Sequence, residues 1–346
     1  MLNRYIGGML TFFLVATFVV GPTAQAATVR PRLTNRAILM RSLENVSKAK
    51  SLMVIGDVRA TETRTYDYTD SLPRTESLTA QFATFLDITN EDHPKALVTV
   101  SNLQLQDGGE VYRGGEANVL IDNDVVYFYL DVFSSLPKDF FDYSALEKKW
   151  LRIDSNTFGS MAGEEFDLGE LKKSHNLTEA QKKQILMALQ TYNVLLITRA
   201  KDEKLDGVDA YRLQLKLNRG RLVAFLNRVN KIVDGTYMTR AELTDLRREV
   251  ATATLPTLDL WVDKTQLLPR KVTVNYRQKE VDTLGTNMLT FGLTVNFSNY
   301  NDLPTPIVAP AQSEDFMVVL EKVSADMRSQ RNSLETAVLV TPVPGY

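Results

Sequence analysis

The chain has 346 residues, 44% hydrophobic and 24% charged, which is a composition typical of a globular protein with one large domain or two small ones. Its net charge is −2, and basic residues are interspersed with acidic ones, which argues against a general nucleic-acid binder. Cysteine is absent, which excludes disulfides, thiolate metal sites, a cysteine nucleophile and a lipid anchored on an N-terminal cysteine.

Residues 1–26 have the features of a secretory signal peptide. Arg4 supplies the positive start, residues 6–20 are uncharged and mostly apolar, and Ala24-Gln25-Ala26 places small residues before a cut at Ala27. We therefore expect an exported bacterial protein of the periplasm, the cell envelope or the extracellular space. An N-terminal membrane anchor is the alternative, although the apolar stretch is short for a spanning helix.

The first half of the mature chain predicts one helix followed by strands. Residues 33–50 have apolar positions close to helical spacing, and strand patterns begin near residue 52. Asp122-Asn123-Asp124 is predicted to be a polar hairpin turn, with a metal site on the two aspartates as the alternative. Residues 127–130 are aromatic on both faces, which predicts a strand in the middle of the sheet.

The middle of the chain predicts helices on either side of an amphipathic strand. Thr178 and Gln181 fit a capping box, as do Thr239 and Glu242, so a helix is expected to begin at each. Between them, residues 211–217 alternate apolar and polar side chains and therefore predict a strand. A helix with an apolar stripe follows that strand, over residues 222–232.

Three successive strands are predicted between residues 257 and 297, because apolar and polar side chains alternate in each run. They form an antiparallel meander with one apolar face. By the same alternation, Trp261 is expected to point away from that face. The prolines after residue 303 end the main domain, which we place at residues 27–312, followed by a C-terminal helix and flexible tail at 313–346.

Residues typical of catalysis or metal binding do not form a recognisable set. His93 and His175 are the only histidines, each stands among loop-type residues, and neither has a partner at metal-ligand spacing. The sequence has no G-x-S-x-G elbow and no phosphate-binding glycine motif. We therefore expect a protein that is not an enzyme, with no cofactor and no metal.

The order of these elements and several loose motifs resemble the LolA-like superfamily, which includes the outer-membrane lipoprotein carrier and lipid-binding proteins of the LppX/LprG type. The similarity spans about residues 37–312. Its motifs are Val126-Tyr127-Phe128-Tyr129-Leu130, then Leu260-Trp261-Val262-Asp263, and last Val295-Asn296-Phe297 leading into prolines. The resemblance implies an α+β fold, with a strongly curved antiparallel half-barrel sheet and helices packed against its concave face.

The resemblance also implies a groove that holds a lipid or another hydrophobic ligand, with a membrane surface or an envelope protein as a further partner and no nucleic acid. An envelope sensor or scaffold that uses the fold for protein interactions is the alternative, and the helices are expected either to gate the groove or to fill it. The candidate ligand-binding residues are Leu213, Leu215, Leu222, Phe225, Leu226, Leu258, Leu260, Val262, Val272, Val274, Phe291, Leu293 and Val295.

Overall fold

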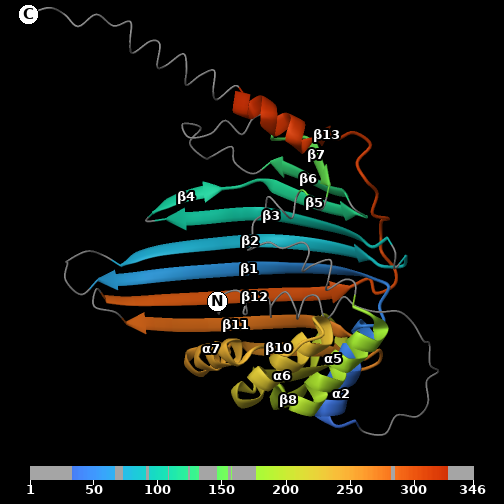
Figure 1. The fold of residues 1–346 in the computed structure, drawn as a ribbon, viewed down its shortest axis with the longest axis vertical. Helices are drawn as coiled ribbons and strands as arrows, with labels where there is room; N and C mark the ends of the chain where they lie inside the picture. The colour runs from blue at the N-terminus through green and yellow to red at the C-terminus, as the bar shows by residue number, and fades with distance from the viewer. Residues whose placement is uncertain are drawn as a thin grey trace, which may run out of the picture.

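A computed structural model describes residues 33–66, 73–90, 93–107, 109–123, 125–131, 146–154, 157, 177–281 and 285–325. The signal peptide, His175, Asp124 and the tail after residue 325 lie outside these residues. The described chain forms one curved, unclosed sheet of thirteen strands with helices on it (Figure 1). The expected α+β half-barrel is therefore confirmed.

The sheet runs in the order β13-β7-β6-β5-β3-β2-β1-β12-β11-β10-β9-β8, and the short strand β4 pairs with β3. All neighbours are antiparallel except β13 and β7. The strands are β1 (Ser51–Tyr66), β2 (Arg74–Asp87), β3 (Lys95–Asp107), β4 (Glu110–Arg113), β5 (Glu116–Asp122), β6 (Val125–Asp131), β7 (Trp150–Asp154), β8 (Leu195–Leu205), β9 (Val208–Leu217), β10 (Thr257–Asp263), β11 (Pro269–Val281), β12 (Gly285–Ser298) and β13 (Glu314–Asp315).

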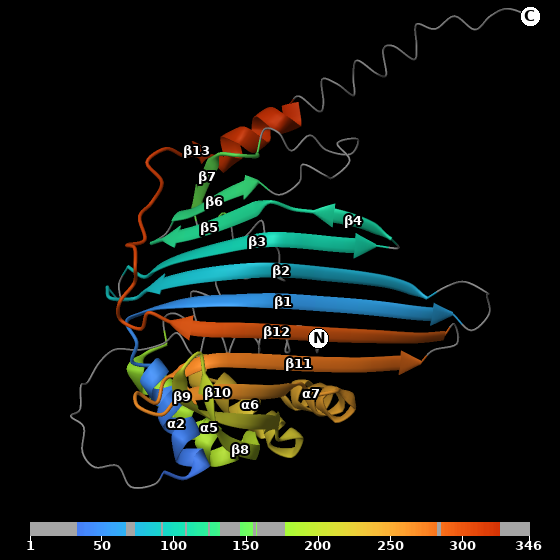
Figure 2. The same ribbon diagram turned by 180° about the vertical axis from the view of Figure 1, so that it is seen from behind.

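Four helices, α2 (Asn35–Val46), α5 (Glu179–Tyr192), α6 (Arg219–Val233) and α7 (Arg240–Thr252), gather at the end of the sheet made by β8 to β11 (Figures 1 and 2). Both predicted capping boxes are present, since Thr178 and Gln181 begin α5 and Thr239 and Glu242 begin α7. A further helix, residues 316–325, follows β13 at the opposite end.

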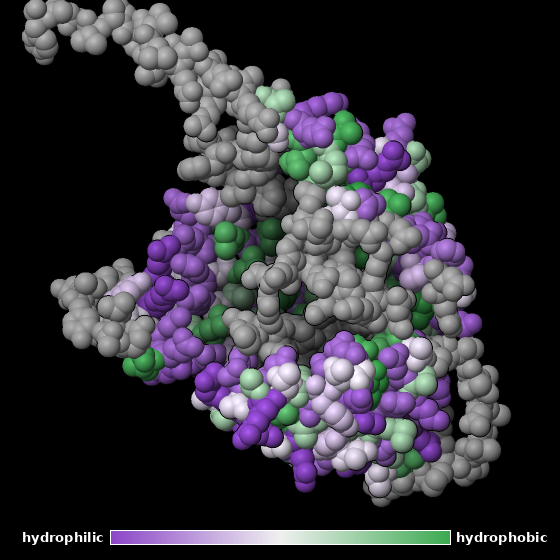
Figure 3. All heavy atoms as spheres, in the orientation of Figure 1, coloured by the Kyte–Doolittle hydropathy of each residue, from purple (hydrophilic) through white to green (hydrophobic). Residues whose placement is uncertain are grey.

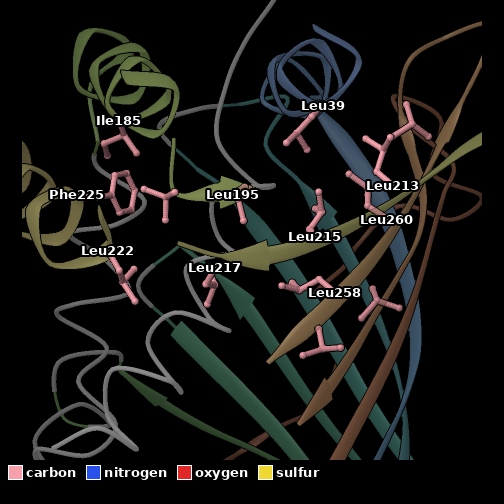
Figure 4. Close-up of a cluster of buried hydrophobic side chains, with 14 of the residues drawn as sticks. Leu39, Ile185, Leu195, Leu213, Leu215, Leu217, Leu222, Phe225, Leu258 and Leu260 are labelled. Carbon is pink, nitrogen blue, oxygen red and sulfur yellow. The ribbon is translucent and has the colours of Figure 1, made fainter. Parts of the chain in front are cut away.

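The helical end holds the largest core of the protein. Leucines from β8, β9 and β10 point toward α2, α5 and α6 (Figure 4), and Leu213 of β9 is the most buried of them. The same cluster extends across the sheet to Leu52 and Val54 of β1. The apolar face predicted for the meander is therefore the face that the helices cover.

The other end of the sheet has its own cover. Residues 299–313 lead from β12, which lies beside β1, to β13, which lies beside β7. They therefore pass the ends of the strands that separate β12 from β13 (Figures 1 and 2). Phe316 then packs edge-on against Phe128, with ring centroids 5.0 Å apart, and Val319 and Val323 are buried against Leu151. A Lys149–Glu314 ion pair of 2.8 Å holds the start of this segment.

The position predicted for the aromatic strand is wrong. β6 is third in the order from the β13 edge, not in the middle of the sheet. Its aromatic residues are explained by a cover on each face and not by a central position. Phe128 is covered by Phe316, and Tyr129 packs against Trp150 on the opposite face, with ring centroids 5.7 Å apart. A strand near an edge can therefore be apolar on both faces when a distant helix covers one of them.

Two pairs of neighbouring strands are joined by short connections. β5 ends at Asp122 and pairs with β6, which begins at Val125, so the hairpin predicted there is present, while Asp124 itself lies outside the described residues. β8 and β9 are joined through Asp206 and Gly207, whose φ values of 50° and 81° are those of a two-residue hairpin turn with the twist that strands favour.

Asp263 fixes the turn between β10 and β11. Its side chain is buried; Oδ1 accepts hydrogen bonds from the Thr265 and Gln266 N–H groups at 2.7 and 2.9 Å, and Oδ2 accepts one from Arg270 at 2.9 Å. Burial alone would raise the pKa of Asp263, but these hydrogen bonds outweigh it, and the pKa lies below its ordinary value.

We expect Asp263→Asn to lower the free energy of unfolding by about 2 kcal/mol at pH 7, because the hydrogen bonds lose their charged acceptor. A lowered pKa stabilises the fold above pH ~4, where the unfolded chain ionises, and this stabilisation is lost as the pH falls through the folded pKa. Urea unfolding at pH 7 and pH 3 should therefore show the difference between the two proteins shrink with acid. Equal differences at both pH values would contradict the assignment, and the exposed Asp245→Asn serves as the control.

Candidate functional site

The concave face is the candidate site, and the strand register shows which residues lie on it. Directly paired residues of neighbouring strands point to the same side of a sheet. Val54, Val58 and Ala60 of β1 therefore share a face with their partners on β2 and β12, and Val54 and Val58 belong to the core cluster under the helices. Ile55 and Asp57, between them, lie on the opposite, convex face.

All of the candidate ligand-binding residues lie on this face or on the helices that cover it, within one cluster. Most of them are buried as core, and Leu213 and Val262 have no exposed surface at all. Leu226, Val272 and Phe291 are only partly buried and lie at its margin. The helices thus fill the groove at this end, which is the second of the two arrangements expected.

Trp261 points away from this cluster, as predicted. Its indole N–H donates to Glu203 Oε1 at 2.8 Å, and the guanidinium of Arg212 lies 4.8 Å from the ring centre. Arg212 in turn bonds Asp259 at 3.1 Å, and Lys271 lies 5.5 Å from the same ring. Glu203 also forms an ion pair with Lys201, and we interpret the group as a structural network on the convex face.

Between the two covered ends, the middle strands present apolar side chains that are not fully buried. Leu78 and Leu105 pair directly and are 39% and 43% exposed. Green hydrophobic residues line a hollow over these strands in Figure 3. We call this set the central band; its members are Val58, Ala60, Leu78, Phe82, Val100, Leu105 and Phe291.

Gly56 lets the band continue across β1. It pairs with Phe82 of β2 and Val295 of β12, so a side chain at this position would lie on the concave face. A Cβ at this position would overlap both the Phe82 ring and the carbonyl oxygen of Thr294. The Phe82 ring therefore occupies the space above Gly56 and forms part of the surface of the band.

Toward the tips of the long strands, the same face becomes polar. Two successive cross-strand rows there carry charged or amide side chains, which we call the polar rim. Hydrophilic residues occupy this side of the hollow in Figure 3. The rim consists of Glu62, Arg64, Arg74, Glu76, Asp107, Gln278, Glu280 and Asn287. The concave face is therefore amphipathic along the strands.

In the described part of the chain, no three His, Asp or Glu residues are grouped so as to hold a metal ion. His93 is exposed in the bend between β2 and β3, in keeping with a loop position. None of the helices in the described residues is both long and apolar enough to span a membrane.

Comparison with known proteins gives weak similarities. No family model matches the chain, and no curated protein matches it. Among solved structures, the LolA superfamily protein NE2245 from Nitrosomonas europaea covers 80% of this chain and 98% of its own, with 11% identity and a TM-score of 0.17.

Two other solved structures score lower. The outer membrane protein OprG from Pseudomonas aeruginosa covers 72% of this chain and 94% of its own, with 10% identity and a TM-score of 0.12. MucB, solved in complex with MucA(peri), covers 71% and 90%, with 8% identity and a TM-score of 0.10. At these values the similarities assign neither a family nor a function.

The two parts of the concave face should respond differently to truncation. Leu215→Ala, in the buried cluster, is expected to lower the free energy of unfolding by about 2–5 kcal/mol, because it opens a cavity. Leu105→Ala, in the central band, should cost below about 1 kcal/mol, because its side chain is already 43% exposed. Urea denaturation of both variants measures the contrast, and similar losses would show that the band is packed core.

Proposed function

We propose that this protein is an exported, non-enzymatic protein that binds a lipid or another hydrophobic ligand on its concave face. The observation that carries the proposal is the central band, where apolar residues on neighbouring strands face the same side without full burial. Contiguous apolar surface of this kind is costly in water and is typical of binding sites. The predicted signal peptide fits a role in the cell envelope.

The band, more than the helical cluster, is the part of the face that a ligand would contact. The helices already occupy the space above Leu213 and Leu260, whereas Leu78 and Leu105 keep substantial exposed surface. Phe291, Leu293 and Val295 of β12 connect the two regions, since they pair with Ala60, Val58 and Gly56. Among the candidate ligand-binding residues, we therefore expect Phe291 of β12, which is only partly buried, to contact a bound ligand.

An acyl chain is a suitable ligand for such a surface. Burial of one CH₂ group contributes about 0.8 kcal/mol, so a chain of about a dozen buried carbons would offset the entropic cost of association. The band needs no specific polar partner to bind it.

A second candidate function is an envelope sensor or scaffold that binds a protein. Two observations favour it: the helical end is a packed interior, and Tyr66, Val111 and Val281 near the strand tips are exposed apolar residues. Extraction of the protein purified from its own envelope distinguishes the two functions. A co-purified lipid supports the carrier, whereas a stoichiometric protein partner without lipid supports the scaffold.

Ligand binding can be tested with a matched pair of substitutions. Leu105→Gln places an amide on the central band, and Ile55→Gln places one on the convex face of β1 at the same 43% exposure. We expect Leu105→Gln to weaken binding of a neutral fluorescent hydrophobic probe about tenfold, because a polar group replaces apolar contact area. Ile55→Gln should leave the dissociation constant unchanged.

Saturable binding by the unsubstituted chain is the first requirement of this titration, and its absence would refute the proposal. Equal weakening by the two substitutions would place the ligand elsewhere. Thermal unfolding of both variants checks that neither result comes from loss of the fold.

A further inference from the structure

The concave face changes from apolar to charged at one position along the strands. The row of Phe291, Ala60, Leu78 and Leu105 on β12, β1, β2 and β3 is wholly apolar. One row closer to the tips, the residues are Leu289, Glu62, Glu76 and Asp107. The next row holds Glu280, Asn287, Arg64 and Arg74. Because the boundary falls at the same level on β1, β2 and β3, an amphiphile lying along the band would meet polar groups with its head.

The rim is rich in carboxylates. Four of its side chains, Glu62, Glu76, Asp107 and Glu280, are acidic and two, Arg64 and Arg74, are basic, so its net charge is −2 (2 − 4). Glu110 of β4, which pairs with Asp107, adds another carboxylate on the same face. The basic neighbours Arg277 and Lys279 alternate onto the convex side of β11.

Both guanidinium groups are already engaged within the rim. Arg64 Nη2 lies 2.7 Å from Glu62, and Arg74 Nη2 lies 2.6 Å from Asp107, with Glu76 at 3.2 Å from Arg74 Nε. They are therefore poorly placed to bind a phosphate or sulfate head group, which needs free donors.

The rim instead presents acceptors. Glu280 accepts from the Gln278 amide and has no cationic partner among the described residues. Asn287 donates to Glu62 at 2.9 Å, and its own Oδ1 is buried without a hydrogen-bond partner. A ligand that brings N–H donors and a positive charge would pair with the exposed carboxylate of Glu280.

We propose that the polar rim binds an amine-bearing head group, so that the ligand is a cationic or amine-containing amphiphile whose tail lies on the central band. This inference rests on the proposed function. It adds the orientation of the ligand, with the head at the strand tips near Glu62 and Glu280, and it adds a preference for an ammonium group over an anionic one.

The test compares three amphiphiles that have the same alkyl chain and different heads: dodecylammonium, dodecyl glucoside and laurate. Each competes with a bound neutral fluorescent probe at pH 8, below its critical micelle concentration and at low salt. We expect dodecylammonium to displace the probe at about a tenfold lower concentration than laurate, with the glucoside between them. The preference should shrink as salt is added, because exposed charges are screened.

A pair of charge-matched double variants locates the effect. Glu76→Gln with Glu280→Gln removes two rim carboxylates and should lower the preference for dodecylammonium to about twofold. Glu44→Gln with Asp302→Asn removes one carboxylate from helix α2 and one from the segment after β12, at the opposite end of the long strands from the rim, and should leave the tenfold preference intact. The neutral probe should bind both variants as it binds the unsubstituted chain.

The outcomes separate this inference from the function on which it rests. If the three amphiphiles compete equally, or if laurate binds best, the head-group assignment is overturned while hydrophobic binding stands. If both double variants lose the preference equally, the effect is one of net charge and the assignment to the rim is overturned. If the neutral probe does not bind at all, the proposed function and this inference both fail.

Discussion

The pairing of β1 with its two neighbours is the constraint on which the rest of the structure depends. β1 pairs without interruption with β12 from Met53 to Tyr66 and with β2 from Ser51 to Arg64. A shift of one residue would turn every side chain of a strand to the other face. Asp57 and Arg59 would then lie against the apolar cluster and Val58 would lie in water, so the register alone decides that a continuous concave face exists.

Much of this architecture could be predicted from the sequence, because it depends on local patterns. The alternation of apolar and polar residues predicts the meander and the side on which Trp261 lies. The capping boxes predict the starts of α5 and α7. The location of β6 could not be predicted in this way. The alternation of residues in a strand shows that a face is apolar but does not show which element covers it. For β6 the cover is the helix of residues 316–325, which is far away in the chain.

The candidate site was predictable only to the level of a face. Leu213 and Leu105 both stand at alternating apolar positions of a strand, yet the first is fully buried under α2 and the second is 43% exposed. Periodicity reports the direction of a side chain and carries no information about what covers it. The prediction therefore favoured the strands with the clearest alternation, which are those with the most complete cover, and missed the band on β2 and β3.

The polar rim and the helical cluster give the concave face different energetic roles. The large core under α2, α5 and α6 contains most of the buried leucines, and the second cover at β6 and β7 secures the far edge. Because each end of the sheet has its own buried cluster, the central band can keep apolar surface in contact with solvent at modest cost to the fold. The concave face is buried at both ends and apolar between them, and it becomes charged toward one set of strand tips. Such a face distinguishes the two ends of any ligand that lies along it. Under the proposed function, the strand register would select not only which side chains a ligand meets but also the direction in which it lies.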